Sequence, residues 1–381
     1  MKARTQLGQA FRRTAAGLLL MLVGLMAPAA RAAEVKTVFV IPLENHNWTQ
    51  PASDKYAPQP LLGNPHAPFL NRLVTPGNPL SAQVSYASAY HNLNARPGGH
   101  RQGIHPSEPN YIWMEAGTNF GVQDDNPPYG LGGSNQNTTH HLATMLRQAG
   151  KTWKSYQEDI DTDAAGNVLP PDQWVSPIRA RFGTYRIVAN AYNGSRRFNY
   201  APKHNPMIFF RDTNGGDDPT PKNPAAKFYA PIQQLAIDLK NNTVADYNWI
   251  TPNQFNEMHS PLPEGYRGLK GDAAAIKEGD DCLAKLVPMI MASKAYRDNG
   301  LIIIWCDETE GKNADDYQHT LPLIVISPLA KGHAYTNHIN YDHSSTLRTL
   351  QNIFGVKPYL GAAAQATDLS DLFNADTGNV K

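Results

Sequence analysis

The amino-acid sequence predicts an α/β fold with a mainly parallel central sheet and helices on both faces. Short apolar segments alternate with segments of helical periodicity, the order typical of strands joined by helical crossovers. Two of the apolar segments, 35–43 and 301–306, are apolar almost throughout, as strands buried on both faces are. Each runs directly into polar residues, Glu44-Asn45 and Asp307-Glu308. Open α/β sheets bind ligands at the carboxyl ends of their strands, so the site is expected there.

The other elements follow from shorter periodic segments. Strands are expected over 152–157, 247–251 and 321–327, and helices over 110–116, 138–150, 225–239, 280–296 and 344–354. Pro288 is expected to kink the helix over 280–296. Two stretches rich in Pro, Gly and Asn, 47–80 and 160–222, read as a loop and as a long insertion over one sheet edge. No repeat or linker is visible, so residues 33–381 are expected to form one domain.

The first 32 residues have the pattern of a secretory signal peptide. A basic start precedes the apolar run 15–27, and Ala30-Arg31-Ala32 fits a cleavage site. The run is short for a bilayer span, although a retained N-terminal anchor stays open as the alternative. Removing these residues takes away five basic side chains and no acidic one, which would change the formal charge from +1 to −4. The protein is therefore expected to be periplasmic or extracellular.

Charge and cysteine content narrow the possible partners. A mildly acidic chain lacks the basic surface that nucleic acids need, and no later segment resembles a membrane span. Cys282 and Cys306 are the two cysteines, and an oxidising compartment would allow one disulfide between them. The sequence leaves that pairing open, as it does the oligomeric state. It contains no C-x-x-C zinc pattern.

The two strand ends supply hard oxygen ligands for a metal. Adjacent carboxylates such as Asp307 and Glu308 repel one another unless a cation neutralises them. Together with Glu44 and Asn45 they suit Mg²⁺, Ca²⁺ or Mn²⁺ better than a structural zinc ion. The alternative is ordinary turn chemistry, with Asn45 as a cap and the acids solvated.

Ser107 is the candidate nucleophile. Pro106 and Pro109 restrict the backbone on either side, and a helix is expected to follow. A serine at a helix start can direct its oxygen to an anion bound by free backbone N–H groups. An N-cap serine would give the same pattern, and spacing alone does not separate the two.

The motifs, taken in order, resemble the phosphoesterase family of the alkaline phosphatase superfamily, which includes secreted acid phosphatases and bacterial phospholipases C. The resemblance covers about residues 35–355. It is carried by Glu44-Asn45, the block from His105 to Tyr111, and Trp305-x-Asp307-Glu308. Further landmarks are 249–253, Met258-His259, Gly279-Asp280 and 326–332. The residues after Glu44-Asn45, His46-Asn47-Trp48-Thr49, are closer to the acid phosphatases than to the phospholipases.

The resemblance implies an alkaline-phosphatase-like fold and a phosphoserine mechanism. Ser107 would attack phosphorus, beside one divalent metal cation bound by Glu44, Asn45, Ser107, Asp307 and Glu308. His259 is the first candidate for acid–base catalysis, and His91 for contact with the phosphate. His319 and His343 are weaker candidates. By contrast, His140, His141 and His204 read as surface histidines without a role.

We therefore expect a secreted, metal-dependent acid phosphatase that hydrolyses phosphate monoesters of small molecules or lipids. The alternatives are a phospholipase C-type phosphodiesterase and a phosphoinositide phosphatase. A secreted binding protein that keeps the fold without turnover is the alternative from another class. The natural substrate, the metal and the pH optimum do not follow from the sequence.

Overall fold

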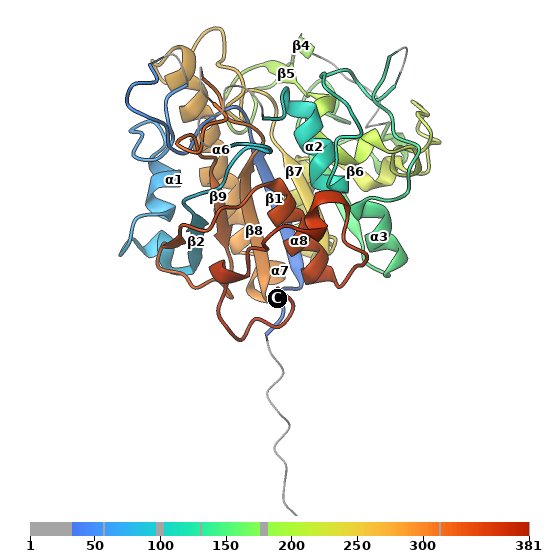
Figure 1. Cartoon of the computed structure of the whole chain (residues 1–381). Helices are drawn as coiled ribbons and strands as arrows, with labels where there is room; N and C mark the ends of the chain where they lie inside the picture. Colours follow the sequence, from blue (N-terminus) through green and yellow to red (C-terminus); the bar gives the residue numbers. More distant parts are fainter. Residues whose placement is uncertain are drawn as a thin grey trace, which may run out of the picture. The chain divides into compact units, whose positions relative to one another are not determined.

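The computed structural model describes residues 33–55, 58–96, 103–129, 132–175, 182–311 and 314–380. The proposed signal peptide lies outside the described residues. An eight-stranded sheet runs through the middle in the order β10-β2-β9-β8-β1-β7-β3-β6 (Figure 1). The strand bounds are β1 Thr37–Leu43, β2 Val84–Ala87, β3 Trp153–Gln157, β6 Tyr229–Pro231, β7 Tyr247–Thr251, β8 Gly300–Cys306, β9 Leu323–Ile326 and β10 Tyr335–Asn337.

The sheet is parallel except at one strand. β9 pairs antiparallel with both β8 and β2, while all the other neighbouring strands are parallel. The central strands β1 and β8 are buried along nearly their whole length, which explains their continuous apolar sequence. The predicted α/β class with a mainly parallel sheet is therefore confirmed.

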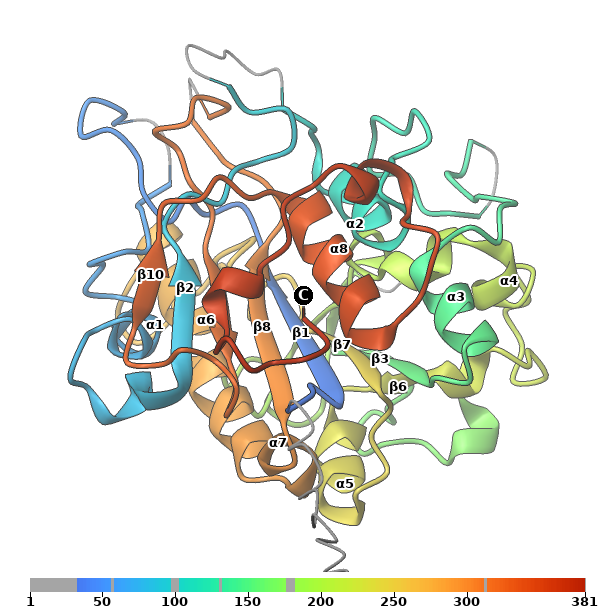
Figure 2. The same ribbon diagram turned by 60° about the horizontal axis from the view of Figure 1, so that its bottom comes forward.

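Helices cover the two faces of the sheet (Figures 1 and 2). On one face α2 (Ser107–Ala116) packs against α8 (His343–Phe354), and on the other α1 (Pro68–Leu73) packs against α6 (Gly271–Met291). α8 begins at an Asp342 cap that forms a reciprocal capping box with Ser345, three residues further along in Asp342-His343-Ser344-Ser345. None of the helices among the described residues is both long enough and apolar enough to cross a bilayer.

Several predicted boundaries were wrong. The helix expected over 280–296 begins at Gly271 and ends at Met291, with Pro288 inside it. A separate helix α7 (Lys294–Arg297) follows, because the Ser293 side chain accepts the Tyr296 N–H and starts a new turn. The expected helix over 138–150 is α3 (Leu142–Gln148). The one over 225–239 splits into β6 and α5 (Gln233–Asn241).

The region predicted as loop, 47–80, contains α1, which was missed because it is short and begins at Pro68. The insertion 160–222 holds a two-stranded sheet, β4 (Phe182–Tyr185) with β5 (Arg197–Asn199), and α4 (Arg211–Asn214). It does more than cover a sheet edge, because its segment 202–209 packs beside α2.

The two cysteines do not form a disulfide. Both are free thiols and both are buried. Cys282 lies in the middle of α6, since that helix begins nine residues earlier than expected. The Cys306 thiol lies 3.6 Å from the His46 carbonyl oxygen instead.

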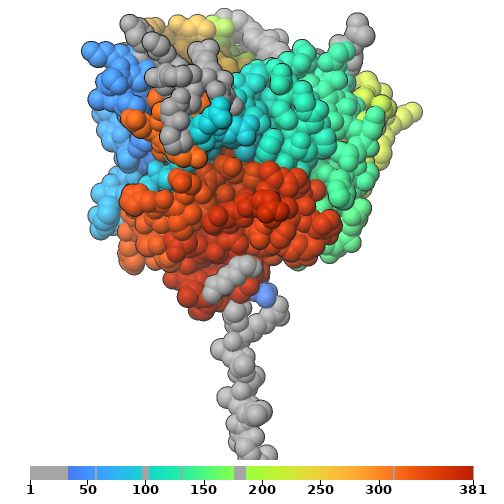
Figure 3. Space-filling view, in the orientation of Figure 1, coloured from blue at the N-terminus to red at the C-terminus, as the bar shows by residue number. Residues whose placement is uncertain are grey.

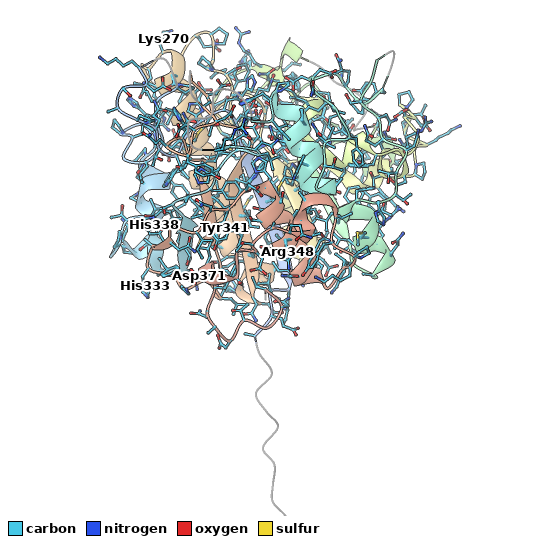
Figure 4. The ribbon with its side chains drawn as sticks, viewed as in Figure 1. Lys270, His333, His338, Tyr341, Arg348 and Asp371 are labelled. Atoms are coloured by element: carbon cyan, nitrogen blue, oxygen red, sulfur yellow. The ribbon has the colours of Figure 1, made fainter. Side chains whose placement is uncertain are left out.

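The residues that follow α8 cover the face of the sheet on which α8 lies. In the space-filling view they lie directly against the segment containing α2 (Figure 3). Asp371 fixes them to the edge strand β10, accepting hydrogen bonds from Lys331 Nζ (2.9 Å), Tyr335 Oη (2.8 Å) and Asn337 Nδ2 (2.8 Å). Figure 4 labels Asp371 and Tyr341, whose hydroxyl accepts a second Asn337 hydrogen bond (3.1 Å).

Candidate active site

Ser107 is the first residue of α2, and its hydroxyl meets both strand ends. Oγ lies 3.0 Å from Glu44 Oε2 and 3.3 Å from Glu308 Oε1, so its single proton is directed at two carboxylates. The residue is only 1% exposed. The sheet register explains the meeting: Leu43 pairs with Cys306, so Glu44 and Asp307 leave adjacent strands side by side.

Asn45 connects the two strand ends. Its backbone N–H donates to Asp307 Oδ1 (3.2 Å), and its Nδ2 donates to Glu308 Oε1 (3.2 Å) and Glu310 Oε1 (2.8 Å). Asn45 has a φ of 53°, a left-handed conformation that asparagine tolerates better than most residues. The predicted set of Glu44, Asn45, Ser107, Asp307 and Glu308 is thus brought together, and Glu310 joins it.

Three carboxylates of this cluster, those of Glu44, Asp307 and Glu308, have raised pKa values. Burial raises the pKa of Glu44 well above its usual range, and repulsion from Asp307 and Glu257 adds to it. Burial, then Glu308, raises the pKa of Asp307 to about 8. Asp307 Oδ2 and Asn45 Oδ1 are buried without a hydrogen-bond partner. Buried acids that repel one another, beside buried oxygens without hydrogen-bond partners, fit a bound cation.

A second group, missed from the sequence, extends the cluster. His204 Nε2 lies 3.3 Å from Glu44 Oε1, and His204 Nδ1 lies 2.6 Å from Glu257 Oε1. Tyr111 Oη donates to Glu44 Oε1, and its ring stacks on His204 with centroids 5.0 Å apart. All four side chains are fully buried. The prediction that His204 is a surface histidine without a role was therefore wrong.

Glu44, His204 and Glu257 form a possible three-residue metal site, with one donor atom from each within 4.8 Å of the others. Burial, with repulsion from Lys203 and His259, lowers the pKa of His204 well below its usual range, so it is a neutral imidazole with a lone pair to offer. A nitrogen donor removes part of the reason for preferring Mg²⁺, Ca²⁺ or Mn²⁺ over zinc. No motif in the sequence pointed to His204, because it lies in the irregular insertion 160–222.

His259 lies close to Asn45 and His204. It lines a hollow of about 280 Å³ together with Asn45, Met258 and Glu310, and its ring centroid is 5.8 Å from that of His204. Its Nδ1 bonds to Ser260 Oγ (2.9 Å). Burial, then repulsion from Lys203, lowers its pKa to about 4, so the ring is neutral above that pH. The structure thus brings His259 close to the cluster.

His91 and His319 lie elsewhere. His91 bonds to Asn340 Oδ1 (3.1 Å) and lines a separate hollow with Asp342, and its ring contacts the Tyr317 ring at a tilt of 39°. His319 pairs with Asp54 at 2.9 Å. Among the described contacts, neither histidine meets Ser107 or the acidic residues at the strand ends.

His343 supports the site from α8. Trp305 Nε1 donates to His343 Nδ1 (2.9 Å), so the ring proton is on Nε2, which bonds to the Asp307 carbonyl oxygen (2.5 Å). Burial lowers its pKa to about 3, so the ring stays neutral. His343 therefore fixes the main chain of Asp307.

His105 borders the main cavity of the site. That cavity, of about 700 Å³, is also lined by Trp113, Glu308 and Glu310. His105 Nδ1 lies 2.5 Å from Glu308 Oε2, and Nε2 lies 3.1 Å from Asp315 Oδ1. Burial alone would lower the pKa of His105, but Asp315 and Glu308 raise it to about 10. This imidazole therefore stays protonated at neutral pH.

The sequence profile of the Phosphoesterase family matches residues 96–357. The chain belongs to the Phosphoesterase family. The family and its phosphatase relatives make this chain a phosphoric ester hydrolase, as the motifs predicted. The site described above is where its chemistry is expected.

Relatives of this phosphoesterase are phosphatases. It is 26% identical to a phosphatidylinositol-3-phosphatase from Mycobacterium tuberculosis, over 94% of this chain and 91% of that one. It is 25% identical to a probable acid phosphatase from Kluyveromyces lactis, over 68% of this chain, and spans about half (50%) of that relative. Among solved structures, a protein in the alkaline phosphatase superfamily from Vibrio parahaemolyticus aligns with a TM-score of 0.41 and 11% identity, over 91% and 75% of the two chains.

Proposed function

We propose that the protein is a metal-dependent phosphomonoesterase of the acid-phosphatase type, acting through a phosphoserine on Ser107. One observation carries the proposal: the buried Ser107 hydroxyl is directed at Glu44 and Glu308, at the ends of the two central strands. A serine that only capped a helix would direct its oxygen at backbone N–H groups.

We propose that Glu44, Asn45, Ser107, Asp307 and Glu308 hold the cation. His204 and Glu257, which form a possible metal site with Glu44, are further candidate ligands. When bound, such an ion supplies positive charge that favours an ionised serine oxygen and stabilises charge on the phosphoryl oxygens. Glu44 belongs to both groups, so it is the ligand on which the site depends most.

In the first proposed step the Ser107 oxygen bonds to phosphorus, and its proton passes to Glu44 or Glu308, the acceptors it already faces. The ester oxygen leaves with the bonding electrons and takes a proton, for which His105 at the cavity is the proposed donor. Water then attacks the phosphoserine and gives its proton to His259 Nε2, since Nδ1 is engaged with Ser260. The bond between phosphorus and Ser107 Oγ breaks, phosphate departs, and the carboxylate that took the serine proton returns it to Oγ.

Substrate class and location complete the proposal. The Mycobacterium tuberculosis relative, whose length this chain nearly matches, favours a phosphoinositide phosphatase as the second candidate. The basic and apolar pattern of residues 1–32 supports secretion. We propose a periplasmic or extracellular enzyme on that ground.

The test compares three substrates with metal-supplemented protein: p-nitrophenyl phosphate, p-nitrophenyl phosphorylcholine, and phosphatidylinositol 3-phosphate in vesicles. We expect the protein to release phosphate from p-nitrophenyl phosphate and from phosphatidylinositol 3-phosphate, and to release little p-nitrophenol from the phosphorylcholine diester. A strong preference for the diester would favour the phospholipase C type. Absence of turnover with all three would overturn the proposal.

Ser107→Ala tests the nucleophile. Removing the attacking oxygen should lower kcat by roughly 10³-fold or more, with the fold intact by circular dichroism. Acid-quenched wild-type enzyme given ³²P-labelled substrate should carry label on serine, and the variant should not. Ser293→Ala is the matched control, since this helix-start serine should affect only stability, by about 1 kcal/mol. Wild-type rates in Ser107→Ala would refute the phosphoserine.

A further inference from the structure

A lysine stands beside the site with no part in the mechanism above. Lys203 directly precedes His204, and its Nζ lies 2.8 Å from Asp125 Oδ2. Its side chain is only 15% exposed. Asp125 therefore holds the ammonium group near the protein surface, next to a residue that contacts Glu44.

Asp125 also binds the helix that carries the nucleophile. Its Oδ1 accepts the backbone N–H of Glu108 (3.1 Å), the residue after Ser107. One carboxylate thus connects Lys203 to the first turn of α2. On the other side of the lysine, the next residue, His204, contacts Glu44, and Glu44 accepts the Ser107 hydroxyl.

The charge of Lys203 acts on the site. Burial alone would lower its pKa, but attraction to Glu44 and Asp125 raises it, with a contribution from Asp307. Burial raises the pKa of Glu257 well above its usual range, and the Lys203 charge opposes part of that rise. The Lys203 ammonium group therefore lies within electrostatic range of Glu44 and Asp307, two of the acids around Ser107.

A purely structural ion pair is the competing explanation. Lys154 and Asp238 form such a pair, at the same 2.8 Å and with a lysine 18% exposed, on β3 and α5. What distinguishes Lys203 is its position, because Asp125 ties it to the helix turn of the nucleophile.

We propose that Lys203 binds a non-bridging oxygen of the substrate phosphate and favours dianionic monoesters over monoanionic diesters, with Asp125 as its positioning residue. The inference rests on the proposed function. A phosphate monoester carries nearly two negative charges above pH 6 and a diester carries one. An added cation therefore stabilises the bound monoester more than the bound diester.

The test measures kcat/KM for p-nitrophenyl phosphate and for bis(p-nitrophenyl) phosphate at pH 7.5. Lys203→Met should lower the monoester value roughly tenfold to a hundredfold, the range for losing a charge-assisted hydrogen bond, and the diester value much less. Lys203→Arg should recover most of the loss. Asp125→Asn should raise KM for the monoester more than it changes kcat, because it misplaces the lysine without removing its charge.

Lys154→Met is the matched control and should leave the ratio of the two kcat/KM values unchanged. An equal loss on both esters, or no loss in Lys203→Met, would overturn the inference. Calorimetric titration with inorganic phosphate keeps the two proposals separate. If wild-type protein hydrolyses neither ester, the proposed function fails, whereas weaker phosphate binding by Lys203→Met alone would still support the lysine's role.

Discussion

At the scale of single residues, Glu44 joins the parts of the site. One carboxylate oxygen accepts the Ser107 hydroxyl and the other faces Tyr111 and His204. Such a side chain is costly to bury with its charge, and the high pKa of Glu44 reflects that cost. A bound cation would offset it. The same reasoning applies to Asp307, whose Oδ2 has no hydrogen-bond partner.

Asp307→Asn should therefore weaken metal binding. The amide oxygen can still accept the Asn45 N–H, but the charge is lost. We expect the metal concentration for half-maximal activity to rise by about 10-fold to 100-fold, while the metal-free variant unfolds at the same or a higher temperature. Metal titration of chelator-treated enzyme measures the first effect and differential scanning fluorimetry the second.

Asp298→Asn serves as its control, because Asp298 is a 52% exposed partner of Lys36 at the surface. It should leave the metal requirement unchanged. An Asp307→Asn enzyme with the wild-type requirement would remove Asp307 from the ligand set.

At the scale of elements, the segment after β7 packs closely against α6. This segment, 252–259, carries Glu257 and His259, and Met258 has a φ of 78° within it. Gly279 on α6 makes room for it, since a Cβ there would collide with Met258 Cγ and come within 2.8 Å of Met258 Cε. The helix glycine thus sets the position of two site residues.

Gly279→Ala should displace this segment. We expect kcat/KM to fall by roughly 10²-fold, the scale of an ångström-sized misplacement, with stability little changed because better helix propensity opposes the clash. The double variant Gly279→Ala/Met258→Ala should recover activity, since it removes the colliding atoms. If the single variant is fully active, the segment does not depend on this contact.

A buried histidine connects three helices. His141, at the start of α3, lies 3.0 Å from Glu115 of α2 and 2.9 Å from Asp212 of α4. Burial alone would lower the pKa of His141, but bonds to Asp212 and Glu115 raise it overall. Contrary to the sequence-based reading, this histidine is fully buried and structural.

The pH dependence follows from the raised pKa of His141. Its stabilising effect is complete below the unfolded value of about 6.5 and is lost as pH rises through the folded value. The difference in unfolding free energy between wild type and His141→Gln should therefore shrink as pH rises from 6 toward 9. Urea unfolding at each pH measures it. A difference independent of pH would show that His141 is not charged in the folded protein.

At the scale of the whole molecule, the site lies on the two central strands of the sheet, so its ion should support the entire fold. Chelation should lower the melting temperature, because buried acids are then left to repel one another. Restoring an ion at 100 times its dissociation constant should return about 2.7 kcal/mol. Scanning fluorimetry with EDTA and then with Mg²⁺, Mn²⁺, Ca²⁺ or Zn²⁺ measures this and ranks the metals.

Mass spectrometry should first show that EDTA has removed the metal, leaving less than one ion per chain. If the melting temperature of that protein equals the value before EDTA, the cation makes no structural contribution. Lys154→Met, remote from the ligands, should show the same EDTA response as wild type.

The sequence by itself determined the sheet class, the two strand ends and the serine, because buried parallel strands are marked by continuous apolar runs and their polar ends face one edge. Only the tertiary structure decided that His204 and Glu257 complete the cluster, that His91 stands apart, and that the cysteines stay unpaired. Local patterns encode elements and their ends. Contacts between Glu44 and a histidine 160 positions further along, within an irregular insertion, depend on how the whole chain packs.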